Sequence, residues 1–148
     1  MLGFIIIAHS PLASALKAVA AHAFPECIQS LEALDVPPDM PPEEIEARAR
    51  VMIERVAKPD ALIFTDVFGA TPSNTTRNLI DGTHVKLIAG VNVPMLYRSL
   101  GHANEPLDAV MTRALVGAKE GVMLVATSRP QNQTFKPGGN GQDPNQDQ

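Results

Sequence analysis

The sequence predicts an α/β fold built on an open, doubly wound parallel sheet flanked by helices. Short apolar runs alternate along the chain with stretches of helical spacing, and this alternation is typical of strand-helix-strand units. The first run, residues 2–8, is apolar and rich in Ile, as expected for a central strand that helices cover on both faces. His9 and the pair Ser10-Pro11 follow it directly, at the junction where such folds place their ligands.

Composition limits the classes of function. The chain has 148 residues, of which 45% are hydrophobic and 19% charged, and this suits one globular domain. Its net charge is −4 and its Lys and Arg residues are scattered, so it lacks the basic stripe that nucleic-acid binding needs. Cys27 is the single cysteine, no apolar run approaches the roughly 20 residues of a membrane span, and no basic leader precedes the first strand. We therefore expect a cytoplasmic protein.

The first two strand-helix units come before residue 60. Ser10 is a favourable N-cap and Pro11 suits the first helical position, and apolar residues line one face of a helix that runs to about Ala23. A second strand is expected at 28–36, where apolar residues alternate loosely. After a proline-rich connection, residues 43–56 have the spacing of a second helix.

The third unit repeats the pattern of the first. Residues 61–65 form an apolar run that stops at Asp66, and they predict a third strand. A loop then leads into a short helix at about 73–80, with Thr71 as its predicted cap. The Thr-Pro pair repeats the arrangement of Ser10-Pro11, so we expect two helix N-termini to face one site.

The end of the chain differs in composition from the rest. From Arg129 onward, Gln, Asn, Pro, Gly and Asp dominate, and such a segment cannot bury enough apolar surface to order itself. We expect one domain at 1–127 and a disordered polar tail at 128–148. The elements expected between the third unit and the tail are a strand at 85–89, a helix starting at 92–94, a helix at 108–119 ended by Gly121, and a fifth strand at 122–126.

Placement separates the four histidines. His22 ends the first helix, where it interacts with the helix dipole, whereas His84 precedes a strand and His102 lies in a loop. Only His9 lies at the carboxyl end of a predicted strand, which leaves a catalytic role and a histidine satisfied by backbone groups as alternatives. Histidines this dispersed predict no metal site, and we expect no cofactor.

Asp66 favours the catalytic alternative for His9. It ends the third strand, which we expect to lie beside the first in a doubly wound sheet. Its carboxylate can then accept a hydrogen bond from one ring nitrogen of His9 and leave the other as a nucleophile. The alternative is that Asp66 only starts a turn through local backbone bonds.

Three segments together resemble a known family. They are the strand ending in Ala8-His9, the run Phe64-Thr65-Asp66-Val67-Phe68-Gly69-Ala70-Thr71-Pro72-Ser73-Asn74, and the run Ile88-Ala89-Gly90-Val91-Asn92-Val93-Pro94-Met95-Leu96. In this order they resemble the IIA component of the mannose class of the bacterial phosphoenolpyruvate-dependent sugar phosphotransferase system. The resemblance covers about residues 1–127.

The resemblance implies a phosphocarrier. His9 is expected to take a phosphoryl group from phosphorylated HPr and to pass it to a IIB component, while Asp66 orients the imidazole. The Thr71 hydroxyl and the amides of the loop Phe68, Gly69, Ala70 and Thr71 are expected to hold the phosphate oxygens, with Ser10 beside them. Phosphoryl transfer depends on positioning and charge stabilisation, which these groups can supply.

The family fold implies a homodimer. Four parallel strands are flanked by helices, and a fifth, antiparallel strand, here 122–126, is exchanged between the subunits. Contact with a membrane is then only indirect, through a transporter complex. Two positions depart from the family pattern: Ala70 stands where a second glycine is frequent, and Ser10 stands where a glycine frequently follows the histidine. Ala70 raises the question of whether the loop needs a positive φ there, which a Cβ penalises.

Other functions are open to a chain of this kind. A regulatory protein of an incomplete phosphotransferase system would also be phosphorylated on His9, and its phosphorylation state would control binding to another protein. The phosphocarrier subunit of dihydroxyacetone kinase shares the fold and the histidine, but the motifs at 66–72 and 92–96 favour the sugar system. A flavodoxin-like module that binds a nucleotide or flavin lacks support, since there is no Gly-rich fingerprint and only 4% of residues are aromatic.

Overall fold

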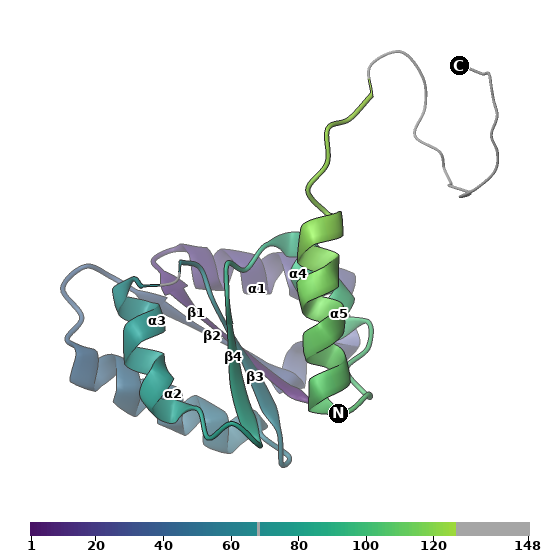
Figure 1. Cartoon of the computed structure of the whole chain (residues 1–148). Helices are drawn as coiled ribbons and strands as arrows, with labels where there is room; N and C mark the ends of the chain where they lie inside the picture. The colour runs from purple at the N-terminus through teal and green to yellow at the C-terminus, as the bar shows by residue number, and fades with distance from the viewer. Residues whose placement is uncertain (68, 127–148) are drawn as a thin grey trace, which may run out of the picture.

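The computed structural model describes residues 1–67 and 69–126, and in this range strands and helices alternate as the sequence predicts (Figure 1). The elements are β1 (Gly3–His9), α1 (Leu12–Ala23), a 3-10 helix η1 (Pro25–Ser30), β2 (Leu31–Val36), α2 (Pro42–Val56), β3 (Ala61–Thr65), α3 (Thr71–Thr76), a 3-10 helix η2 (Arg77–Leu79), β4 (Val85–Ala89), α4 (Val93–Leu100) and α5 (Leu107–Glu120).

The sheet has four parallel strands in the order β2-β1-β3-β4. β1 pairs with β2 on one side and with β3 on the other, and in this register Ile7 lies opposite Thr65. β1 is buried at every position except its last, His9. The prediction of a central first strand beside the third is therefore confirmed, and it brings the carboxyl ends of β1 and β3 together.

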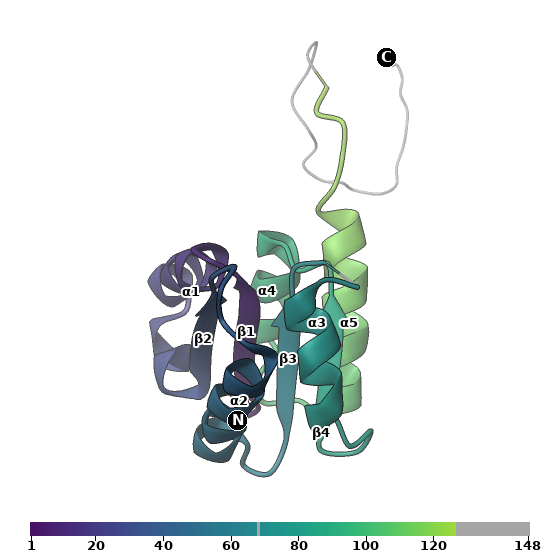
Figure 2. The same ribbon diagram turned by 90° about the vertical axis from the view of Figure 1, so that its left-hand side faces the viewer.

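Helices cover both faces of the sheet (Figure 2). Alternation along each strand sends successive side chains to opposite faces, so that Ile5 and Ile7 of β1 belong to one core while Phe4 and Ile6 belong to the other. The first core packs against α2, and the second packs against α1, α4 and α5. This three-layer arrangement confirms the predicted α/β class.

Three predicted boundaries are wrong. The second strand begins at Leu31 rather than at residue 28, because Pro25–Ser30 forms a 3-10 helix. Ser10 does not cap α1: Pro11 takes the N-cap position and makes no side-chain cap bond. Ala70, and not Thr71, is the N-cap of α3, which therefore begins two residues earlier than predicted.

Ser10 is displaced from the capping role by a tertiary contact. Asp35 Oδ1, at the end of β2, accepts a hydrogen bond from the Ser14 amide at 2.9 Å, so the carboxylate of another strand satisfies an amide in the first turn of α1. A cap supplied from 21 residues further along the chain leaves no local sequence signal.

The C-terminal segment forms no strand within the single chain. Residues 122–126 have no regular secondary structure, and Leu124 is 96% exposed. Within the described residues no strand pairs with the outer edge of β4. The exchanged fifth strand stays a prediction, as does the domain boundary at residue 127, and the predicted tail at 128–148 lies outside the described residues.

Among the described helices, none combines the length and the apolar character that crossing a membrane would require.

Candidate functional site

The candidate site lies where β1 and β3 end side by side. His9 is the last residue of β1, and Asp66 directly follows β3. The two residues are 57 positions apart in the sequence, and the parallel pairing of β1 and β3 brings them together at the carboxyl ends of the strands. Open α/β sheets bind ligands at this end of the sheet.

Asp66 makes two contacts with His9. Its Oδ2 lies 2.7 Å from His9 Nδ1 and accepts the His9 amide hydrogen at 3.1 Å, while Oδ1 accepts the Val67 amide hydrogen at 2.9 Å. An ionised carboxylate only accepts hydrogen bonds, so Nδ1 carries the proton. The lone pair of the neutral imidazole is then on Nε2, and the His9 side chain is 53% exposed. The ring can act as a nucleophile toward a group that arrives from solvent.

The charge of Asp66 is stabilised despite its burial. Burial of the side chain, which is 11% exposed, acts to raise the pKa of Asp66, but hydrogen bonds from the His9 ring, the His9 amide and the Val67 amide together lower it below its ordinary value. Asp66 therefore presents a fixed negative charge to the imidazole, which favours any positive charge that develops on the ring.

Ser10 offers only its side chain to a ligand. Its amide donates to the Val36 carbonyl at 3.0 Å, and Pro11 has no amide hydrogen. Because Asp35 also occupies the Ser14 amide, the first turn of α1 is a weaker anion site than the sequence predicts.

The loop before α3 has the backbone geometry that the sequence left in question. Gly69 has a φ of +88°, whereas Ala70 has a φ of −80° and a ψ of 167°. The positive φ therefore falls on the glycine, and Ala70 adopts an extended conformation that carries no penalty for a Cβ. Thr71 follows as an exposed residue, and Phe68, the remaining predicted member of this loop, lies outside the described residues.

Sequence reasoning gave no role to two residues that shape the site. Asp35 holds the first turn of α1, and the Asn74 side-chain amide donates to the Gly69 carbonyl at 3.0 Å. Asn74 stands at the end of a motif quoted for the family resemblance, which is a usable signal. Asp35 has none, since its partner lies in another element.

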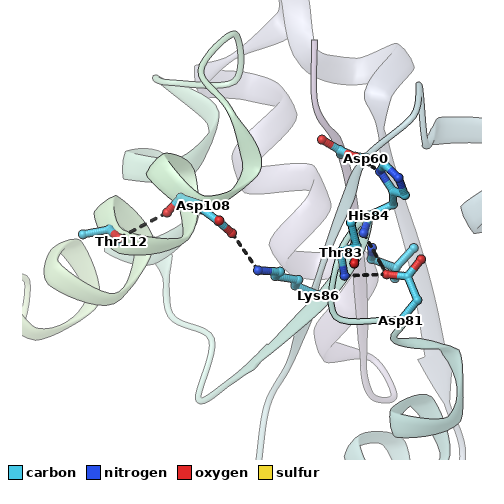
Figure 3. A network of polar contacts seen from close by, with 8 residues as sticks. Asp60, Asp81, Thr83, His84, Lys86, Asp108 and Thr112 are labelled. Carbon is cyan, nitrogen blue, oxygen red and sulfur yellow. Dashed lines mark hydrogen bonds and ion pairs between the residues drawn. The ribbon is translucent and has the colours of Figure 1, made fainter.

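A second histidine-carboxylate pair, His84 with Asp60, directly precedes β4 and β3, at the amino ends of these strands (Figure 3). His84 Nδ1 is 2.6 Å from Asp60 Oδ1, and this hydrogen bond raises the pKa of His84. Asp81 accepts the amide hydrogens of Thr83, His84 and Val85 and adds a second negative charge beside His84. Two carboxylates therefore disfavour the binding of an anion at His84 more than the single carboxylate of Asp66 does at His9.

Neither remaining histidine belongs to the candidate site. His102 Nδ1 donates to the Arg98 carbonyl at 2.8 Å, and His22 lies in the last turn of α1. In the part of the chain that the structure describes, no group of His, Cys, Asp and Glu side chains could hold a metal ion.

Comparison with known proteins points to one family. Residues 3–114 match the profile of the family EIIA-man, described as "PTS system fructose IIA component". No curated protein sequence gives a significant match.

Solved structures share the fold at low sequence identity. The mannose/sorbose-specific IIA subunit of the phosphotransferase system from Enterococcus faecalis has a TM-score of 0.77 at 14% identity, covering 88% of this chain and 98% of that one. The phosphotransferase component EIIA from Streptococcus agalactiae has a TM-score of 0.73 at 18% identity, with coverage of 83% and 96%. The IIA protein associated with the fucose utilization operon of Streptococcus pneumoniae has a TM-score of 0.72 at 17% identity, with coverage of 82% and 91%.

Proposed function

The chain belongs to the family of fructose IIA components of the sugar phosphotransferase system, and from this premise we propose that it is a phosphocarrier whose His9 accepts a phosphoryl group from phospho-HPr and passes it to a IIB component. The family assignment confirms the resemblance drawn from the three sequence motifs. The observation that carries the proposal is the 2.7 Å contact between His9 Nδ1 and Asp66 Oδ2, which leaves Nε2 as the nucleophile of a side chain that is 53% exposed.

The transfer step follows from this geometry. The Nε2 lone pair of His9 attacks phosphorus in the phosphohistidine of HPr, a P–N bond forms to Nε2, and the donor's P–N bond breaks with its electron pair returning to the donor nitrogen. The Nδ1 proton stays between His9 and Asp66, whose charge balances the positive charge that develops on the ring. The reverse attack by a nucleophile of the IIB component returns His9 to its starting state.

The phosphate oxygens are proposed to lie against the loop that precedes α3. The amides of Gly69, Ala70 and Thr71 and the Thr71 hydroxyl are the donors in this proposal, together with the Ser10 hydroxyl and residue Phe68. Backbone amides and hydroxyls of this kind hold anions without a metal ion.

We also propose that the working form is a cytoplasmic homodimer. The outer edge of β4 has no partner strand in the described chain, and the apolar residues of 122–126 are exposed. An unpaired edge and an unpartnered apolar segment complement each other, so the segment of one subunit can add an antiparallel strand to β4 of the other.

Phosphorylation with purified components tests the phosphocarrier function. The protein is incubated with phosphoenolpyruvate, enzyme I and HPr, and its intact mass is measured with and without acid treatment. We expect one acid-labile phosphate per chain, absent in His9→Ala. His84→Ala is the matched control, since it removes the histidine of the second carboxylate pair and should be phosphorylated like the wild type. Full labelling of His9→Ala would overturn the assignment.

A regulatory role is the second candidate. One structural relative is described as a sigma-54 interaction domain protein from Enterococcus faecalis, with a TM-score of 0.64 at 13% identity, so the fold is not restricted to sugar uptake. Chasing the phosphorylated protein with IIB components separates the two roles: loss of the phosphate to a IIB component supports the carrier, whereas a stable phosphoprotein that changes its binding to another protein supports the regulator.

A further inference from the structure

We propose that Asn74 is a positioning residue for phosphoryl transfer, because it holds the backbone of the loop that follows Asp66, the partner of His9. This inference rests on the proposed function and deepens it by assigning a role to a side chain outside the His9-Asp66 pair. Asn74 touches neither reacting atom in this proposal and acts through Gly69.

Asn74 is bonded to two consecutive carbonyls of the loop. Its side-chain Nδ2 donates to the Gly69 carbonyl at 3.0 Å, and its backbone amide donates to the Ala70 carbonyl at 2.9 Å. Both distances lie in the range of well-formed hydrogen bonds. Only the second bond belongs to the helix, so the first is a specific contribution of the Asn side chain.

The bond to Gly69 sets the direction of an amide. In a trans peptide the carbonyl and the following N–H point in opposite directions, so a Gly69 carbonyl held toward α3 turns the Ala70 N–H away from α3. That N–H makes a long contact of 3.4 Å with the Val67 carbonyl, which is a weak bond. The Ala70 amide is therefore aimed away from α3 and is poorly satisfied, as a donor to an arriving phosphate needs to be.

Among the described residues, packing does little to hold Gly69. Gly69 has a φ of +88°, and a Cβ built on it would meet nothing within 4 Å, so packing does not fix its conformation. Glycine is also the residue with the most backbone freedom to lose. A single side-chain hydrogen bond to the Gly69 carbonyl therefore contributes strongly to the conformation of the loop. Asn78, further along the chain, donates instead to Glu46 at 3.5 Å.

Two variants of Asn74 and one control test the role. Asn74→Ala removes the side chain, Asn74→Asp keeps its shape but cannot donate once ionised, and Asn78→Ala removes a nearby Asn side chain that does not contact the loop. In rapid-quench measurements with phospho-HPr, we expect both Asn74 variants to lower the maximal rate of His9 phosphorylation about tenfold, with KM unchanged. Asn78→Ala should match the wild type in both constants.

A double-variant cycle keeps the test decisive if Asn74→Ala also lowers stability. Gly69→Ala disturbs the same loop, so adding Asn74→Ala to it should slow transfer much less than Asn74→Ala slows the wild type. Additive effects would overturn the role, as would Asn74 variants that are as fast as Asn78→Ala. A wild-type protein that phospho-HPr does not label would instead overturn the proposed function itself.

Discussion

Asp66 has more hydrogen bonds than any other side chain of the candidate site, since its two oxygens accept three of them. The sequence could predict the pair that it forms with His9, because both residues follow apolar runs and the ends of neighbouring parallel strands meet. It could not predict that the His9 amide is part of the contact, since that depends on the strand register.

Removing the Asp66 carboxylate should slow transfer while leaving the fold intact. In Asp66→Ala the imidazole loses its orientation and the charge that balances the transition state, so we expect the single-turnover rate from phospho-HPr to fall at least about a hundredfold. Circular dichroism checks that the variant is folded. Unchanged kinetics in a folded Asp66→Ala would remove Asp66 from the mechanism.

The lowered pKa of Asp81 predicts that the protein loses stability in acid. Bonds from the amides of Val85, Thr83 and His84 lower the pKa of Asp81 to about 2. A carboxyl whose pKa is lower in the folded state stabilises the protein above its unfolded pKa of 3.8, and this contribution is lost as the pH falls toward about 2. In urea unfolding, the free energy of unfolding of Asp81→Ala should therefore be lower than that of the wild type at pH 6. The difference between the two proteins should shrink between pH 4 and pH 2. A constant difference over that window would contradict this.

Sequence periodicity located the secondary-structure elements better than their ends. The uninterrupted apolar run of β1 and the helical spacing of α2 gave the right element types, because burial on one or two faces leaves a pattern in the sequence. The start of β2 and the caps of α1 and α3 were wrong. The first turn of α1 depends on the contact of Ser14 with Asp35, which joins residues distant in the sequence, and β2 starts late because Pro25–Ser30 forms a 3-10 helix.

The cap that Asp35 provides for α1 should be measurable as stability. We expect Asp35→Ala to lower the free energy of unfolding by about 1 kcal/mol, since an amide in the first turn loses its acceptor. Asp35→Asn keeps an acceptor oxygen and should lose much less. Equilibrium urea denaturation compares the two variants, and equal losses would show that the charge of Asp35 matters more than the hydrogen bond.

At the scale of the whole molecule, the four parallel strands and the two helical layers followed from the sequence, whereas the fate of the fifth strand did not. Residues 122–126 have the composition of a strand but pair with no strand within the described chain. The apolar composition of 122–126 predicts that this segment is buried against another surface, but it does not identify that surface.

Loss of residues 122–126 should therefore convert a dimer into monomers. We expect a chain that ends at Gly121 to sediment as a monomer and the full chain as a dimer, because the truncation leaves the edge of β4 without its partner strand. Leu124→Asp places a charge in the same interface and should weaken the dimer without shortening the chain. Equal sedimentation of all three proteins would contradict the strand exchange.

The separation of His9 and Asp66 by 57 residues has a consequence for newly made protein. His9 is synthesised before Asp66, and it has no oriented nucleophile until β3 has been synthesised and has paired with β1. Long-range pairing of this kind is a late and slow event in folding. Under the proposed function, a nascent or misfolded chain is then a poor phosphoryl acceptor. Phosphoryl groups from phosphoenolpyruvate therefore pass mainly to molecules whose sheet is complete.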